Sequence, residues 1–140
     1  MHIANARPLP DPTPISQPYW DACRHHQLDL QQCADCGSYR FPPGYMCPSC
    51  ASMALRWQRV SGRGRVHAYT VVHRPPHPAF AKDAPYVVAL IELAEGAVLM
   101  SNVVGCEPAD VQVGQRVRAT WEPLDDGRHL LLFAPESAGS

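Results

Sequence analysis

Four cysteines in two Cys-x2-Cys pairs are the residues of this 140-residue chain best suited to chemistry. Cys33 pairs with Cys36, Cys47 pairs with Cys50, and ten residues separate the two pairs. A Cys-x2-Cys turn presents two thiolates on one side of a tight loop, and two such turns can supply a tetrahedral shell of four sulfurs. The spacing therefore predicts one four-thiolate metal site.

The type of ligand narrows the choice of metal. Sulfur-only ligation selects a soft or borderline ion, which leaves zinc and iron. We predict zinc, the commoner structural ion, while the rubredoxin-like spelling of the pairs (CADCG and CPSC) keeps iron as an alternative. Because four protein ligands leave no position open for water, the ion is expected to be structural and not catalytic.

Candidates for chemistry outside the quartet are few. His73, Arg74 and His77 lie in the segment HRPPHPAF, which is expected to form a long loop between two strands. His73 or Arg74 could contact a cofactor by proton transfer or phosphate binding, although a solvated loop explains them better. Cys23 and Cys106 have no base beside them in the sequence, so we expect packed thiols and no nucleophile.

The sequence contains no recognisable catalytic set. We find no Gly-rich phosphate loop, no Ser-His-Asp arrangement and no pair of catalytic carboxylates, and we predict no catalytic residue. The run Ser61-Gly62-Arg63-Gly64 has a faint likeness to a phosphate cradle. A turn between two structural units explains that run better.

Three segments are expected to position these residues. Residues 1–27 form a proline-rich arm and a short helix near 19–26, with Ser16 as the N-cap. Residues 28–56 form the ribbon, and residues 57–136 form a barrel. Strands of the barrel are predicted at 65–73, 86–93, 97–104, 116–122 and 130–133, with a helical turn at 107–111. The predicted fold is mainly β: a short helix, a rubredoxin-like zinc ribbon and a five-stranded OB-fold barrel.

Composition excludes several classes of protein. Hydrophobic residues make up 46% of the chain and charged residues 18%, which suits a packed core and not a disordered polyelectrolyte. The net charge of -1 disfavours nucleic acid as a partner, because phosphate affinity comes largely from Lys and Arg. No apolar run approaches the roughly 20 residues that cross a bilayer, and no signal peptide is seen. We expect no membrane partner and a cytoplasmic location, where thiols stay reduced.

The order of helix, ribbon and barrel carries a resemblance to a known family. The matching segments include YWDACRHHQLDLQQCADCG, FPPGYMCPSC, SGRGRVHAYTVVH, APYVVALIELAEGAVLMSNVVG and VGQRVRATWEP. Over roughly residues 14–135 the chain resembles the zinc-ribbon OB-fold proteins grouped as domain of unknown function thirty-five. One departure is His26-Gln27, where a glycine is expected before the leucine, and a helix longer by one turn would follow.

The resemblance implies an accessory role. Members of that family are acyl-CoA-associated proteins that bind thiolase-like enzymes, and the partner carries the main catalytic residues. It implies for this chain a non-catalytic subunit with a thiolase-like or ketosynthase-like partner, in lipid metabolism. The partner would act on acyl-CoA thioesters by condensation, acyl transfer or retro-aldol cleavage, with acyl-CoA near the interface.

Two hypotheses from other classes stay open. The first is a single-stranded nucleic-acid-binding module, since ribbons and OB barrels often serve that use and Arg56, Arg59, Arg63 and Arg65 lie close together in the sequence. The second is a free-standing acyl-CoA-binding enzyme with His73 as its base.

Overall fold

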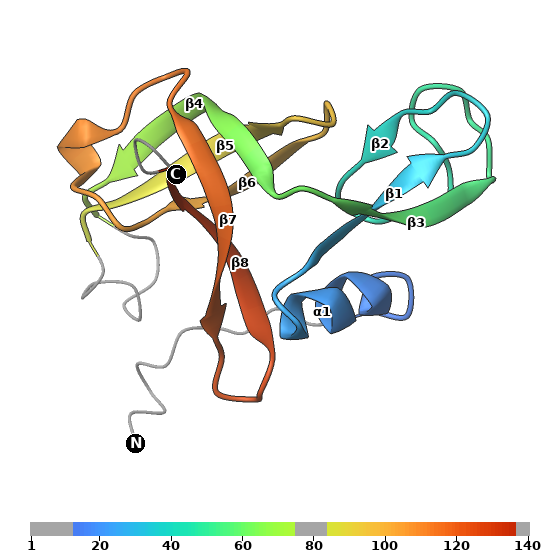
Figure 1. Cartoon of the computed structure of the whole chain (residues 1–140), viewed down its shortest axis with the longest axis horizontal. Helices are drawn as coiled ribbons and strands as arrows, with labels where there is room; N and C mark the ends of the chain where they lie inside the picture. The colour runs from blue at the N-terminus through green and yellow to red at the C-terminus, as the bar shows by residue number, and fades with distance from the viewer. Residues whose placement is uncertain (1–12, 75–83, 137–140) are drawn as a thin grey trace.

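The computed structural model describes residues 13–74 and 84–136, which form a helix, a small sheet and a barrel (Figure 1). Most of the proline-rich arm, at 1–12, and His77 lie outside the described residues. The small sheet and the barrel lie at opposite ends of the molecule's long axis, and a continuous chain from β3 into β4 joins them.

The helix α1 (Gln17–Arg24) packs its aromatic face inward. Tyr19, Trp20 and Cys23 are all buried, as their three-to-four-residue spacing predicts. Ser16 occupies the N-cap position, but its hydroxyl contacts Thr13 and does not cap the helix. The helix ends at Arg24 and is not extended by a turn, because His26 adopts the left-handed conformation (φ 58°) that glycine favours.

The ribbon is built on a three-stranded antiparallel sheet that sequence patterns did not predict. Its strands are β1 (Leu28–Cys33), β2 (Tyr39–Arg40) and β3 (Leu55–Val60), in the order β2-β1-β3. β1 pairs with β3 along its whole length, from Leu28 opposite Val60 to Cys33 opposite Leu55. β3 spans the boundary that the sequence predicts between residues 56 and 57. The division of the chain into three segments stays a prediction.

The barrel has the predicted five strands. They are β4 (Arg63–Val72), β5 (Tyr86–Leu93), β6 (Val98–Val103), β7 (Arg116–Pro123) and β8 (His129–Pro135). The closed order is β4-β5-β6-β8-β7, with β7 pairing back onto β4. A single helical turn, η3 (Pro108–Asp110), lies between β6 and β7, where the sequence predicts one. This arrangement confirms the predicted mainly β fold with an OB-type barrel.

Strand alternation builds the barrel core. Along β5, every second residue from Val87 to Leu93 is buried, and Val117 and Phe133 are fully buried on β7 and β8. The helix side chains Tyr19 and Trp20 join the same cluster, so α1 closes part of the core. Within the described ranges, no helix is both long enough and apolar enough to span a membrane.

Candidate functional site

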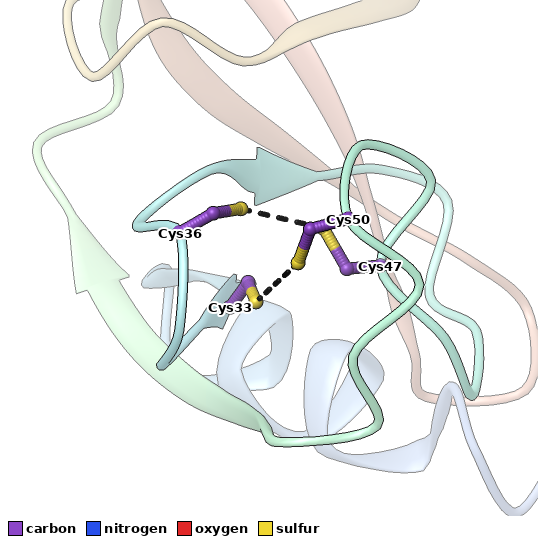
Figure 2. A group of neighbouring side chains, drawn as sticks. All are labelled: Cys33, Cys36, Cys47 and Cys50. Carbon is purple, nitrogen blue, oxygen red and sulfur yellow. Dashed lines mark hydrogen bonds between the residues drawn. The ribbon is translucent and has the colours of Figure 1, made fainter.

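The four cysteines of the two pairs come together at one point of the ribbon (Figure 2). Their Sγ atoms all lie within 4.8 Å of one another. The Sγ atoms of Cys33 and Cys50 are 3.6 Å apart, as are those of Cys36 and Cys47. A tetrahedral ion with metal–sulfur bonds of about 2.3 Å needs sulfurs about 3.8 Å apart. The cluster therefore has the size of a four-thiolate metal site.

The first pair sits on a tight turn that follows β1. Cys33 is the last residue of β1, and the amide of Gly37 donates to the carbonyl oxygen of Cys33 at 2.9 Å. The amide of Cys33 donates to the carbonyl of Ser38 at 2.9 Å. Gly37 has φ 78°, a left-handed conformation that glycine adopts without strain.

The second pair repeats the same turn in an irregular segment. The amide of Ala51 donates to the carbonyl of Cys47 at 2.9 Å, and the amide of Cys47 donates to the carbonyl of Ser52 at 2.8 Å. Ala51 takes the position of the glycine and has φ 64°. Two equivalent turns facing each other explain how short segments without helix or long strand hold four sulfurs together.

The surroundings of the four thiols shift their pKa values in opposite directions. Contact with the Ser38 hydroxyl, 3.3 Å from Sγ, lowers the pKa of Cys36 to about 6. Amide hydrogen bonds, first that of Cys36, also lower the pKa of Cys33. The Ser52 amide acts in the same direction on Cys50, but the neighbouring thiols outweigh it and raise that pKa to about 12. Four thiolates at this distance repel one another, so full deprotonation requires a cation among them.

Gln31 secures the loop before the second pair, a role that sequence patterns did not reveal. It is 3% exposed, and its Nε2 donates to the carbonyl of Gly44 at 3.0 Å. Its Oε1 accepts the amide of Gly44 at 2.8 Å. A Cβ at position 44 would meet the Arg40 guanidinium at 2.6 Å, which is the flexible end of a side chain that can move aside. A polar residue in a strand normally suggests an exposed face, which is why Gln31 was not identified.

The remaining predicted candidates lie elsewhere. His73 and Arg74 are exposed beyond the end of β4 and lie outside the cysteine cluster. Their role in cofactor binding stays a prediction. Cys23 is fully buried, and burial raises its pKa. Cys106 is half-buried, and burial raises its pKa too, so neither thiol is activated as a nucleophile.

A second feature is a groove on the outer face of the barrel. It has a volume of about 550 Å³ and lies where β6 and β8 run side by side. Leu132 is buried there although it points away from the barrel core, since its neighbours Leu131 and Phe133 face inward. The groove is lined mainly by apolar side chains, among them Tyr86, Val88, Met100, Leu130 and Leu132.

A four-cysteine ribbon joined to a five-stranded OB barrel defines the class of this chain: a rubredoxin-like ribbon with an OB fold. Family models match the two parts in turn. Residues 20–56 match the model described as "ChsH2, rubredoxin-like zinc ribbon domain", and residues 57–122 match "ChsH2, C-terminal OB-fold domain".

Individual relatives agree with the models. A DUF35 domain-containing scaffold protein of Methanocaldococcus jannaschii is 41% identical over 101 residues, which are 69% of this chain and 71% of that protein. A probable enoyl-CoA hydratase alpha subunit of Thermomonospora curvata is 41% identical over 117 residues, or 84% of this chain. This chain spans only 36% of that hydratase subunit.

A solved structure shares both fold and sequence. It is described as an Ltp2-ChsH2(DUF35) aldolase, and its matching chain is 38% identical with a TM-score of 0.79. The match covers 91% of this chain and 98% of that chain. The chain belongs to the DUF35 family, as the sequence resemblance predicts.

Proposed function

We propose that Cys33, Cys36, Cys47 and Cys50 hold one zinc ion that maintains the ribbon. The 3.6 Å sulfur contacts fit a four-thiolate ion of either kind, and the matching family model, named for a zinc ribbon, favours zinc over iron. The ion would supply charge neutralisation and a cross-link between the two turns. No reaction passes through it, because four protein ligands close its coordination shell. Such a site suits the cytoplasm, where thiols stay reduced.

The chain as a whole acts as an accessory, non-catalytic subunit of an enzyme that processes acyl-CoA thioesters. One relative is named a probable enoyl-CoA hydratase alpha subunit and another a scaffold protein, and the solved structure is described as an Ltp2-ChsH2(DUF35) aldolase. A thiolase-like or ketosynthase-like partner fits these relations. The partner would supply the catalytic residues for condensation, acyl transfer or retro-aldol cleavage.

The observation that carries this proposal is the apolar surface of the ribbon. Tyr45, Met46 and Met53 are 67%, 50% and 74% exposed, and all three come from the segment around the second cysteine pair. Aromatic residues and Met are enriched in protein interfaces, where their apolar area is removed from water. The ribbon would therefore dock on the partner, and the metal would keep the docking surface rigid.

The groove on the barrel supports a position for the thioester. This groove of about 550 Å³ is lined by apolar side chains and a few polar ones. That lining suits the pantetheine arm or the acyl chain of a CoA thioester, which combines methylene groups with amides. The acyl-CoA would then lie between the barrel and the partner's active site.

Affinity capture tests the proposal. The tagged chain, expressed in its native cell, is expected to recover a thiolase-like or ketosynthase-like protein that mass spectrometry identifies. Variants with Tyr45→Ser and Met53→Ser should recover much less of it, while retaining their zinc. Recovery of no acyl-CoA enzyme, together with a stable solitary monomer in solution, would contradict the accessory role.

A further inference from the structure

Four arginines form a compact basic cluster on the outer face of the barrel. Arg63 lies directly opposite Arg118, and Arg65 lies directly opposite Arg116, in the antiparallel pairing of β4 with β7. Residues opposite each other in such a ladder are about 4.5–5.5 Å apart, and successive residues on one face about 7 Å. Four guanidinium groups therefore project from a rectangle of only about 5 by 7 Å.

The orientation of these side chains follows from the core between them. Gly64 and Val117, which separate the two arginine pairs, face into the barrel, and Val117 is fully buried. A Cβ at position 64 would come within 2.7 Å of the Glu92 carbonyl oxygen, so β4 and β5 approach closely here. The alternation of a strand then forces the arginines on either side outward, where all four are exposed.

Only half of this positive charge is neutralised. Arg65 pairs with Glu92 at 3.4 Å, and Arg118 pairs with Glu136 at 3.6 Å. Arg63 and Arg116 make no ion pair with any residue of the described ranges 13–74 and 84–136. Like charges directly opposite each other destabilise a sheet. A cluster of four arginines against two carboxylates thus has a surplus of positive charge in a chain whose net charge is -1.

The cluster borders the apolar groove. On the outer face of the β7–β8 hairpin, Thr120 lies opposite Leu132, which lines the groove. Arg118 is two residues before Thr120 and therefore a diagonal neighbour of Leu132, with Cα atoms about 7–8 Å apart. An extended ligand that places an apolar portion in the groove could reach the arginines with a charged end.

The backbone of the nearby Ser61–Gly64 turn does not offer an alternative anion site. The Ser61 amide already donates to the Glu95 carboxylate at 2.9 Å, and the Arg63 amide donates to the Ser61 hydroxyl at 3.2 Å. These bonds agree with the interpretation of the run as a turn between units. Any anion held at this edge of the barrel must be held by the side chains.

We propose that Arg63, Arg65, Arg116 and Arg118 bind clustered phosphates, and that these are the diphosphate and 3′-phosphate of a CoA thioester whose arm enters the groove. Arginine suits phosphate because its planar fork can donate two hydrogen bonds to one group. The identity of the ligand rests on the proposed acyl-CoA function. Single-stranded nucleic acid fits less well, because Glu92 and Glu136 lie within the cluster and the net charge of the chain is -1.

Calorimetric titration of the purified full-length chain with CoA tests this assignment. Arg63→Ala combined with Arg116→Ala is expected to raise the Kd for CoA at least about tenfold, which equals about 1.4 kcal/mol of binding free energy. Both side chains lack partners in the described ranges, so their removal should leave the fold intact. The double variant Arg24→Ala with Arg56→Ala removes the same charge elsewhere and should change the Kd by less than about twofold.

Three further ligands identify the source of the phosphates. 3′-Dephospho-CoA should bind more weakly than CoA, and ATP and a short oligo-dT more weakly still, since neither has an arm for the groove. Equal or tighter binding of ATP or oligo-dT would overturn CoA as the ligand. Absence of CoA binding at millimolar concentration, or an unchanged Kd in the Arg63 and Arg116 variant, would overturn the site itself.

The assembly of the same variants with the partner subunit separates this inference from the proposed function. A variant that still assembles but binds CoA as tightly as the wild type contradicts only the arginine site. A wild-type chain that binds CoA through the arginines but recovers no acyl-CoA enzyme contradicts the accessory role instead.

Discussion

The ribbon and the barrel are stabilised in different ways. In the barrel, alternate side chains of all five strands converge on one core that includes the fully buried Ile91, Val117 and Phe133. Between Ala34 and Ala54 in the ribbon, the only fully buried residue is Cys47, which belongs to the cysteine cluster and not to the hydrophobic core. Burial of apolar area can hold the barrel together, whereas this part of the ribbon contributes partly buried side chains, Tyr39 and Phe41, that pack against the edge of that core.

The difference explains why the four cysteines matter to the ribbon. A segment with little core of its own needs a cross-link for stability, and a metal ion bound to four thiolates would supply one. The same segment exposes Tyr45 and Met53, so its apolar side chains remain free for a partner. The barrel thus contains most of the core, and we propose that the ribbon is a docking surface held in shape by an ion.

Removal of the ion should give the largest effect. Cys47→Ser, or treatment with a strong chelator, is expected to unfold residues 34–54, because this segment contacts the core through partly buried side chains such as Tyr39 and Phe41, while the barrel stays folded. Heteronuclear NMR would show loss of the ribbon amide signals with the barrel signals unchanged. Cys106→Ser removes a thiol outside the cluster and should retain the metal. A folded ribbon after verified metal loss would contradict this picture.

Truncation of the barrel core should affect the other region. Phe133 is 0% exposed, so Phe133→Ala should lower the free energy of unfolding by about 3–5 kcal/mol through lost burial and a residual cavity. Urea denaturation measures the loss. Under native conditions the ribbon should keep its metal content and its resistance to chelator. If Phe133→Ala releases the ion, the two regions are not stabilised independently.

Loss of the Gln31 side chain should weaken the ribbon without removing its ion. Gln31→Ala deletes both hydrogen bonds to Gly44 and leaves the Gly44 amide and carbonyl unpaired, at an expected cost of about 1–3 kcal/mol. Amide hydrogen exchange should accelerate at 41–46 first. Gln32→Ala, in the next position, removes one exposed bond to Gly37 and serves as the control. Equal exchange rates in the two variants would show that Gln31 does not secure the loop.

The smallest effect is expected from the surface ion pair on the strands that connect the regions. Arg59→Ala breaks the contact with Asp29, which joins β3 to β1. The Arg59 side chain is 52% exposed, so solvent screens the pair and the melting temperature should be unchanged within error. A drop of several degrees would show that the connection between ribbon and barrel depends on this pair.

Local patterns predicted much of this structure. The alternation of Val117 and Ala119 with Arg118 predicted one strand and its inward face. The paired cysteines predicted the metal site, because a Cys-x2-Cys spacing by itself forms the turn that brings two sulfurs together. Long-range pairing was not predictable. The β1–β3 ladder, the bonds from Gln31 to Gly44, and the meeting of Arg63 with Arg118 join residues 13 to 55 positions apart. No local pattern encodes which strands become neighbours.

The most direct test of the central claim is size-exclusion chromatography of the chain with its captured acyl-CoA enzyme, before and after metal removal. The two proteins should elute together while zinc is bound, in a ratio of one ion per chain by elemental analysis. After chelation they should separate, while the free chain keeps a folded barrel by NMR. A complex that stays intact after its zinc is gone would contradict a docking surface maintained by the metal.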